Sequence, residues 1–386
     1  MNTYVATCMF GLEHSLGSEL DALGLERTLT MDGRVIFRGT PADACRANIN
    51  LRTAERVYLL VGDPFPAPTF DALFEGARAL PWEELIGRND AFPVSGHSVK
   101  SALTSIPDCQ KIIKKALAVR LGSYYKLERM PEDNVVFRVE FFIFKDEAYL
   151  MIDTSGVALH KRGYRPVANA APLRETLAAA IVMNARIRED ILLWDPFCGS
   201  GTIAIEGAML ATHRSPGLNR NFAGEEFPWL PTELWSAARE EARSNIVTDS
   251  AFKAFGSDID PNCIDTAVAN ARRAGVAGNV KFFTADARRI KKPEYNVKGT
   301  LICNPPYGER MMTMRDAENL YRDIGRNFAV FEPWQVYVLT SCEYFEKLYG
   351  RRADKVRKLY NGTIPAYLYQ FFKPRDAFPD RKNFKK

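Results

Sequence analysis

The sequence predicts an α/β protein whose C-terminal part contains a doubly wound, mostly parallel sheet. Residues 355–360 and 366–372, separated by Asn361-Gly362, predict an antiparallel pair added to that sheet. The length of 386 residues, with 46% hydrophobic and 26% charged residues, is typical of two or three folded domains. The main observation is a series of short apolar runs that alternate with helical segments, near residues 191–195, 253–258, 280–283, 300–304 and 335–340.

The N-terminal region has a different organisation. It alternates strand-like with helix-like pieces in the order 4–8, 12–23, 34–37, 41–50 and 56–61. This order predicts a small α+β unit of ferredoxin-like type. A proline-rich connector at residues 62–68 then leads into a second α/β unit.

The second unit extends to about residue 155. It contains a basic helix over residues 108–122, and residues 135–144 and 148–153 are typical of paired strands. On the helix, Lys111, Lys114 and Lys115 share one face because they are spaced i, i+3 and i+4. They are candidates for contact with RNA, and a solvated helix face is the alternative.

Basic residues are unevenly distributed along the chain. The net charge is +5, but residues 351–386 hold 11 basic and 3 acidic residues, a local sum of +8, so the other residues sum to −3. Residues 100–129 hold 7 basic and 2 acidic residues. Such concentrations suit a phosphate backbone, although basic tails are also often merely solvated.

A loop with two glycines follows the first strand of the C-terminal part. Gly199 and Gly201 allow tight turns and close approach of a ligand to the backbone, and the following helix offers unpaired N–H groups. There is no third glycine at the dinucleotide spacing and no lysine, so neither phosphate fingerprint is met. Asp195 would repel phosphate but could hold a ligand ammonium group. The whole loop reads Asp195-Pro196-Phe197-Cys198-Gly199-Ser200-Gly201-Thr202.

Two further strands lead into acidic residues. Asp258-Ile259 ends the strand at residues 253–258, where a carboxylate can accept hydrogen bonds from ribose hydroxyls. Asp286-Ala287 follows residues 280–283, and Asp286 could accept from an adenine amino group. A lone aspartate at a strand end is usually a helix cap or turn former, but three such sites in order rarely arise by chance.

Asn304-Pro305-Pro306-Tyr307 follows the next apolar strand. Proline has no N–H, so this backbone presents mainly acceptors. The Asn304 amide oxygen and the Pro305 carbonyl can accept from an amine, and Tyr307 offers a flat face for stacking. The tetrapeptide predicts a binding site for a planar ring with an exocyclic amino group, with an ordinary turn as the alternative.

These four ordered motifs resemble those of Rossmann-like methyltransferases that use S-adenosylmethionine, and the Asn-Pro-Pro-Tyr form is similar to enzymes that methylate exocyclic amines of nucleobases. Two upstream segments resemble THUMP-domain RNA methyltransferases, especially the bacterial 23S ribosomal RNA guanine-N2 methyltransferases. The resemblance covers nearly the whole chain. The segments are Lys161-Arg162-Gly163-Tyr164-Arg165 and Ala171-Pro172-Leu173-Arg174-Glu175-Thr176-Leu177-Ala178.

The resemblance implies a Rossmann-like class I methyltransferase domain with a mostly parallel seven-stranded sheet. It would span residues 156–386, after a ferredoxin-like unit at 1–62 and a THUMP RNA-binding domain at 63–155. Catalysis would fall to Asn304, Pro305, Pro306 and Tyr307. The methyl donor, with S-adenosylhomocysteine as its product, would be held by Pro172, Asp195, Phe197, Cys198, Gly199, Ser200, Gly201, Thr202, Asp258, Ile259, Asp286, Ala287 and Asn304.

The implied reaction is methylation of a guanine N2 amine in 23S ribosomal RNA or a large-subunit precursor. The base would be flipped out and stacked on Tyr307. Alternatives are guanine-N2 methylation of tRNA, adenine-N6 methylation of DNA, and a non-catalytic RNA-binding assembly factor. No catalytic cysteine is expected, because the Pro-Cys dipeptide of carbon-5 methyltransferases is absent.

Composition argues against several other classes. No apolar run reaches the roughly 18–20 residues of a membrane helix. The seven cysteines contain no C-x-x-C pair and the four histidines show no ligand spacing, so we expect neither disulfides nor a metal site. The N-terminus has no signal-peptide pattern. We therefore expect a cytoplasmic protein without a membrane partner, most simply a monomer.

Overall fold

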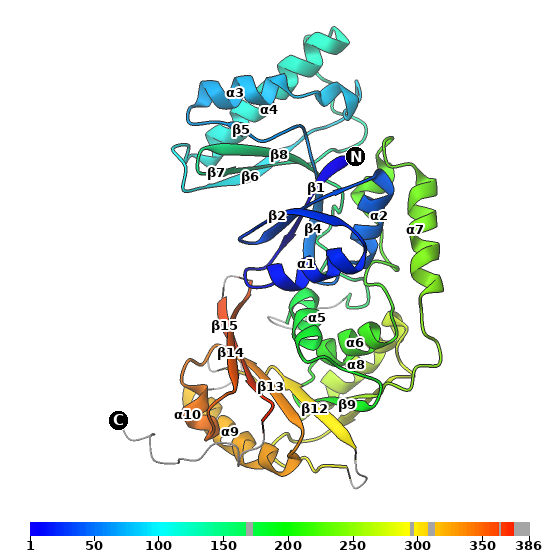
Figure 1. The fold of residues 1–386 in the computed structure, drawn as a ribbon, viewed down its shortest axis with the longest axis vertical. Coiled ribbons are helices and arrows are strands. Elements are labelled where there is room, and N and C mark those ends of the chain that lie inside the picture. Colours follow the sequence, from blue (N-terminus) through cyan, green and yellow to red (C-terminus); the bar gives the residue numbers. More distant parts are fainter. Residues whose placement is uncertain (167–172, 294–296, 308–312, 363, 374–386) are drawn as a thin grey trace.

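The computed structural model describes residues 1–166, 173–293, 297–307, 313–362 and 364–373. Two sheets organise this part of the chain, one in the N-terminal half and one in the C-terminal half (Figure 1). We call them the front sheet and the catalytic sheet. In the elongated molecule, the carboxyl edge of the catalytic sheet faces the front half.

The front sheet has eight strands in the order β2-β3-β1-β4-β8-β7-β6, with the short β5 paired to β8. Neighbouring strands in this sheet are antiparallel, except that β6 is parallel to β7. The helices of this half are α1 (Glu13–Ala22), α2 (Pro41–Asn50), α3 (Phe70–Ala79) and α4 (Ile106–Tyr125). The strands are β1 (Asn2–Cys8), β2 (Glu26–Met31), β3 (Arg34–Gly39), β4 (Ala54–Leu60), β5 (Phe65–Pro66), β6 (Val94–Val99), β7 (Val139–Phe144) and β8 (Glu147–Asp153).

One hydrogen-bonded sheet runs through both units expected in the front half. The link is the antiparallel pair of β4 and β8, in which Tyr58 lies opposite Asp153 and Leu60 opposite Met151.

The local sequence explains where helix α2 begins. Pro41 is its first residue, and Thr40 and Asp43 form a reciprocal capping box.

The catalytic sheet has seven strands in the order β11-β10-β9-β12-β13-β15-β14. Strands β11 to β13 are parallel, β15 is antiparallel to β13, and β14 is antiparallel to β15. This confirms the doubly wound sheet with a terminal antiparallel pair. The strands are β9 (Ile191–Asp195), β10 (Ala254–Asp258), β11 (Val280–Thr284), β12 (Lys298–Cys303), β13 (Gln335–Thr340), β14 (Lys355–Asn361) and β15 (Ile364–Phe371).

Helices connect these strands and also reach the front half. Helix α7 lies in the long connection between α6 and β10 and packs along α2, where Arg46 Nε lies 3.0 Å from Glu241 Oε2. Arg52 donates to the carbonyl of Arg214 at 2.9 Å, which fixes the two halves to each other. The helices are α5 (Glu175–Asn184), α6 (Thr202–Ala211), α7 (Thr232–Ser244), α8 (Pro261–Ala274), α9 (Met314–Asn327) and α10 (Phe345–Tyr349).

Candidate active site

The glycine loop connects the end of β9 to the start of α6, and its two glycines have different surroundings. Both have left-handed backbones, with φ +49° at Gly199 and +84° at Gly201. A Cβ on Gly201 would lie 2.8 Å from Phe282 Cζ and 3.0 Å from Ala267 Cβ, whereas one on Gly199 would meet nothing within 4 Å. Gly201 is therefore required by packing, and Gly199 leaves space through which a ligand can approach the backbone.

Two carboxylates hold this loop in place. Asp195 is 1% exposed, and its Oδ1 accepts from Phe197 N at 3.0 Å. Asp258, at the tip of the neighbouring β10, accepts from Gly199 N at 2.9 Å and from Asp260 N at 3.0 Å. Burial raises the pKa of Asp195 to about 8, and the nearby charge of Asp258 adds to the rise. A cation placed beside Asp195 would restore its ionised form.

The third acidic site has an internal partner. Asp286 follows β11, and its Oδ2 lies 2.7 Å from Arg288 Nη2. The hydrogen bonds from Arg288 lower the pKa of Asp286. Acceptance of an adenine amino group by Asp286 remains a prediction, and it would require sharing the carboxylate with Arg288. Of the other predicted cofactor residues nearby, Ala287 is buried and Ile259 is exposed.

The tetrapeptide after β12 forms a rim at the carboxyl edge of the sheet. Asn304 Oδ1 is buried and has no hydrogen-bond partner among the described residues. Pro305 is buried, whereas Pro306 and Tyr307 are half-buried. Tyr321 of α9 donates its hydroxyl to the Pro306 carbonyl at 3.2 Å. The backbone of the rim is thus held from below while the Asn304 amide oxygen stays available.

The order of the strands brings these sites together. Strands β10, β9 and β12 are neighbours and parallel, so Asp258, Asp195 and Asn304 lie at one carboxyl edge. Neighbouring strands are about 4.8 Å apart, so a ligand held over β9 and β10 would be within reach of one held over β12. In open α/β sheets, ligands bind at this edge.

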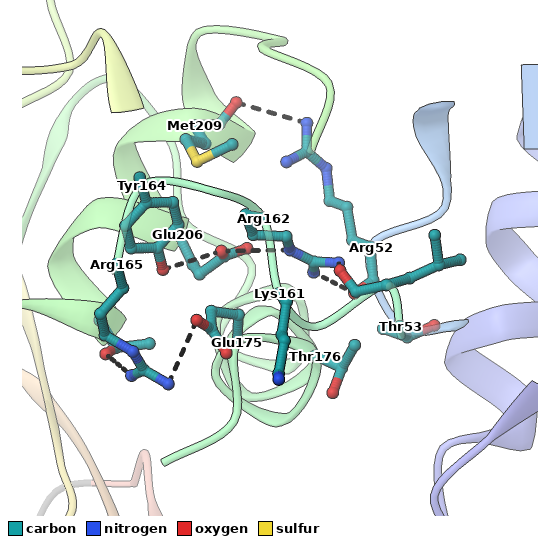
Figure 2. A network of polar contacts seen from close by, with 12 residues as sticks. Arg52, Thr53, Lys161, Arg162, Tyr164, Arg165, Glu175, Thr176, Glu206 and Met209 are labelled. Atoms are coloured by element: carbon teal, nitrogen blue, oxygen red, sulfur yellow. Dashed lines mark hydrogen bonds and ion pairs between the residues drawn. The ribbon is translucent and has the colours of Figure 1, made fainter. Parts of the chain in front are cut away.

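The segment before α5 contacts the start of α6 through Arg165 (Figure 2). Arg165 Nη1 donates to Thr202 Oγ1 at 2.9 Å and to the Leu173 carbonyl at 3.1 Å. Its Nη2 lies 3.2 Å from Glu175 Oε1, and both side chains are buried. Sequence reasoning placed Arg165 in this region only by resemblance, because its partners are distant in the chain.

A second buried pair involves α6, the helix that follows the glycine loop. Glu206 of α6 accepts from the Tyr164 hydroxyl at 3.1 Å, and its Oε1 lies 3.5 Å from Arg162 Nε (Figure 2). Arg162 also donates to the carbonyls of Arg52 and Leu159. The feature of the sequence that indicates this pair is Glu206, the single charged residue in an otherwise apolar helix.

Glu55, in the front half, contacts residues before α5 and at its start. Glu55 of β4 accepts from Thr176 Oγ1 at 2.7 Å, and its carboxylate lies 2.9 Å from His160 Nδ1 and 3.2 Å from Arg174 Nη1. Burial by itself would raise the pKa of Glu55, but the hydrogen bonds from His160 and Thr176 outweigh it and lower the pKa. The cofactor end of the site is therefore supported from both halves.

Helix α4, with the predicted RNA-contacting lysines, lies at the end of the molecule far from β12 (Figure 1). Lys111 is exposed beside Asp108, and Lys115 lies 5.8 Å from the Phe74 ring centroid. Lys114 is paired with Glu132 at 2.5 Å. RNA contact by Lys111 and Lys115 stays a prediction, and Lys114 would first have to leave Glu132.

Of the remaining predicted cofactor residues, Cys198 and Ser200 are buried in the glycine loop, and Pro172 lies outside the described residues. Within the described ranges, no group of three His, Cys, Asp or Glu side chains could hold a metal ion. Among the same residues, no helix is long and apolar enough to cross a membrane.

The glycine loop, the acidic strand tips and the parallel sheet with an antiparallel β15 define a Rossmann-like class I methyltransferase. Family comparisons agree along the chain: an RlmL ferredoxin-like domain matches residues 3–58, a THUMP domain residues 67–153, and an RMKL-like methyltransferase domain residues 162–370. The chain belongs to the RMKL-like methyltransferase family, whose class takes its methyl group from S-adenosylmethionine. The predicted family and fold class are confirmed.

Individual relatives have names consistent with this. A Bacillus subtilis protein named "Putative RNA methyltransferase YpsC" is 42% identical over 373 residues, 96% of each chain. "Ribosomal RNA large subunit methyltransferase K/L" of Psychromonas ingrahamii is 32% identical over 377 residues, which are 96% of this chain and 50% of that relative. The chain thus spans about half the length of its K/L relatives.

Solved structures show the same architecture over the whole chain. The structure of "SMU.472, a putative methyltransferase complexed with SAH" has a TM-score of 0.89 and 40% identity, covering 97% of this chain and 98% of that one. A Listeria monocytogenes structure described as a predicted N6-adenine-specific DNA methylase has a TM-score of 0.90 and 42% identity, covering 97% and 96%. The Listeria description names DNA as the substrate, whereas the names of the sequence relatives specify RNA.

Proposed function

We propose that this chain transfers a methyl group from S-adenosylmethionine to the exocyclic N2 amine of a guanine in 23S ribosomal RNA. The observation that carries the proposal is the buried Oδ1 of Asn304, beside the cofactor end of the sheet, which has no hydrogen-bond partner in the described part of the chain. A buried acceptor without a donor costs free energy, and an amine of a bound base would supply that donor.

The substrate class is supported by two kinds of similarity. The front half contains a match to the THUMP domain, and the K/L relatives are named as ribosomal RNA methyltransferases. The cofactor is supported by the relative whose structure contains S-adenosylhomocysteine. The basic excess of residues 351–386 also suits an RNA partner.

The residues of the chain would bind and orient the reactants. The Asn304 oxygen and the Pro305 carbonyl would accept from the amine, direct its lone pair and stabilise the positive charge that develops on nitrogen. Tyr307 would stack on the flipped base. When bound, S-adenosylmethionine would supply the methyl group from its sulfonium, S-adenosylhomocysteine would be the product, and the amine proton would be released to water.

The glycine loop fits such a donor. Asp195 would pair with the ammonium group, Asp258 would accept from ribose hydroxyls, and the open space at Gly199 would admit the ligand to the backbone. In the proposed organisation, residues 1–62 form a ferredoxin-like unit, residues 63–155 bind RNA as a THUMP domain, and residues 156–386 carry the chemistry. We propose a cytoplasmic monomer that acts on 23S ribosomal RNA or a large-subunit precursor.

The decisive experiment is mass-spectrometric mapping of modified nucleosides in a strain that lacks this protein. Loss of one N2-methylguanosine from large-subunit RNA, restored by the wild-type gene and not by Asn304→Ala, is expected. Loss from tRNA alone would move the substrate to tRNA, and loss of N6-methyladenine from DNA would overturn the RNA assignment. No loss at all, together with no binding of S-adenosylmethionine, would leave a non-catalytic assembly factor.

A further inference from the structure

The β14–β15 hairpin extends past the carboxyl edge of the catalytic sheet. Thr340, the last residue of β13, pairs with Tyr367 of β15, and residues 364–366 continue beyond it. Those residues pair with residues 359–361 of β14. Strands β13 and β15 separate β12 from β14, so the hairpin tip lies about 14 Å along the edge from Asn304, at about 4.8 Å per strand.

The hairpin tip contacts the front half at a fixed loop (Figure 1). Gly11 has φ +89°, and a Cβ there would lie 3.0 Å from the Lys358 carbonyl oxygen. Glu13 fixes the loop by accepting from Gly11 N at 2.9 Å and from Gly33 N at 2.8 Å. The front half therefore reaches the catalytic half at this hairpin as well as beside α5.

The side chains at this junction are aromatic and basic. The rings of Phe10 and Tyr360 meet at 6.0 Å between centroids and 73° between planes. Phe10 is nevertheless 55% exposed, because an edge-to-face pair leaves ring faces open. Lys358 is exposed, and its Nζ lies 5.9 Å from the Tyr360 ring centroid. Pro365 and Tyr367 lie opposite Tyr360 and Lys358 in β15, so they share this face of the hairpin.

Polar contacts connect the junction to the catalytic rim. Tyr321, which holds the Pro306 carbonyl, also shares a hydrogen bond with Thr340 Oγ1 at 2.9 Å. Tyr367, opposite Thr340, donates its hydroxyl to Glu343 Oε1 at 2.7 Å. The junction and the rim are therefore parts of one rigid edge.

We propose that Phe10, Tyr360 and Lys358 form a stacking platform for an unpaired nucleotide of the RNA substrate, near the nucleotide that is methylated at Asn304. The inference rests on the proposed function, since it names where that RNA is held. Phe10 is exposed and Tyr360 is half-buried, so both rings are accessible beside the exposed Lys358. Accessible aromatic faces beside a lysine are the chemistry that binds single-stranded nucleic acid, with rings on bases and ammonium on phosphate. A few nucleotides of an unstacked strand span the distance from platform to rim.

The test uses the full-length protein and unmodified 23S ribosomal RNA transcribed in vitro, at moderate salt. Tyr360→Ala and Tyr360→Leu are each expected to weaken RNA binding by about tenfold, since one stacked base is lost. Tyr360→Phe keeps the ring and should bind as the wild type does. Phe372→Ala is the matched control, because Phe372 is also an exposed aromatic but lies at the opposite edge of the sheet, just after β15.

Binding of S-adenosylmethionine, measured by calorimetry, should be the same in all four variants, which reports an intact catalytic half. Wild-type RNA affinity in Tyr360→Ala would overturn the platform. So would wild-type affinity in Tyr360→Leu, because the ring would then serve only to pack the hairpin against Phe10. Failure of the wild-type protein to methylate any RNA would instead overturn the proposed function, a result distinct from either variant outcome.

Discussion

Two neighbouring parts of the same sheet edge differ in how their polar groups are satisfied. At the tips of β9 and β10, Asp195 and Asp258 already accept from backbone N–H groups of Phe197 and Gly199. At the tip of β12, Asn304 Oδ1 has no partner among the described residues. The polar groups at the cofactor end are thus already paired within the protein, whereas in the proposed function the acceptor at the rim is paired only when substrate binds. Substitutions at the cofactor end should affect folding or cofactor affinity, and substitutions at the rim should affect turnover.

The largest effect is expected at the rim. Asn304→Ala removes the acceptor and should lower kcat by about a hundredfold to a thousandfold, because in the proposed mechanism this group stabilises charge that develops during transfer. The Kd for S-adenosylmethionine should stay within about twofold, since the cofactor end keeps its own hydrogen bonds. Single-turnover methylation and calorimetry measure the two quantities. Wild-type turnover would refute the role, and a collapse of cofactor affinity would show that the two ends are not separable.

The buried pair of Arg162 and Glu206 should affect stability most. Arg162→Met leaves Glu206 buried without its cation, and we expect a loss of about 3–5 kcal/mol in the free energy of unfolding. Arg322→Met is the matched control, since its pair with Glu318 is partly exposed and should be worth at most about 1 kcal/mol. Urea unfolding measures both. Adding Glu206→Gln to Arg162→Met should recover part of the lost stability. Equal losses of stability in Arg162→Met and Arg322→Met would contradict this account.

The two glycines of the loop should respond differently to the same substitution. Both have left-handed backbones, so alanine costs about 1–2 kcal/mol at either position. Gly201→Ala adds a collision with Phe282 and should lower the thermal midpoint more. Gly199→Ala fills the open side and should weaken S-adenosylmethionine binding at a smaller cost in stability. Similar losses of stability and of affinity in the two variants would show that the open space at Gly199 is not a ligand site.

Local pattern was sufficient to predict most of the catalytic sheet. The strands that end at Asp195, Asp258 and Cys303 are short apolar runs, and the motifs follow them directly. Strands β2 and β6 were not foreseen, because β2 is mostly exposed and lacks alternation, and β6 contains Gly96 and His97. Their places are set by pairing with β3 and β7 rather than by their own residues.

Long-range contacts limited the prediction of the site. The spacing of three lysines on α4 was visible, but the pairing of Lys114 with Glu132 depends on the fold of an intervening segment. The contacts of Arg165 with Thr202 and of Glu55 with Thr176 join residues distant in the chain. A sequence pattern identifies residues that can carry the chemistry, whereas the residues that position them emerge only from packing.

The smallest expected effect is the pH dependence of ligand binding, which tests the contribution of Asp195 to the cofactor end. Burial raises the pKa of Asp195 to about 8, while an unfolded aspartate ionises near pH 4. Between these values the folded protein binds the additional proton, so this contribution to stability falls as pH rises from about 4 to about 8 and is constant above. A ligand ammonium favours the ionised form, so affinity for S-adenosylhomocysteine should rise severalfold between pH 6.5 and 7.5. Calorimetry on Asp195→Asn should show a weaker and flatter pH dependence; an unchanged slope would mean that Asp195 is not the group that titrates.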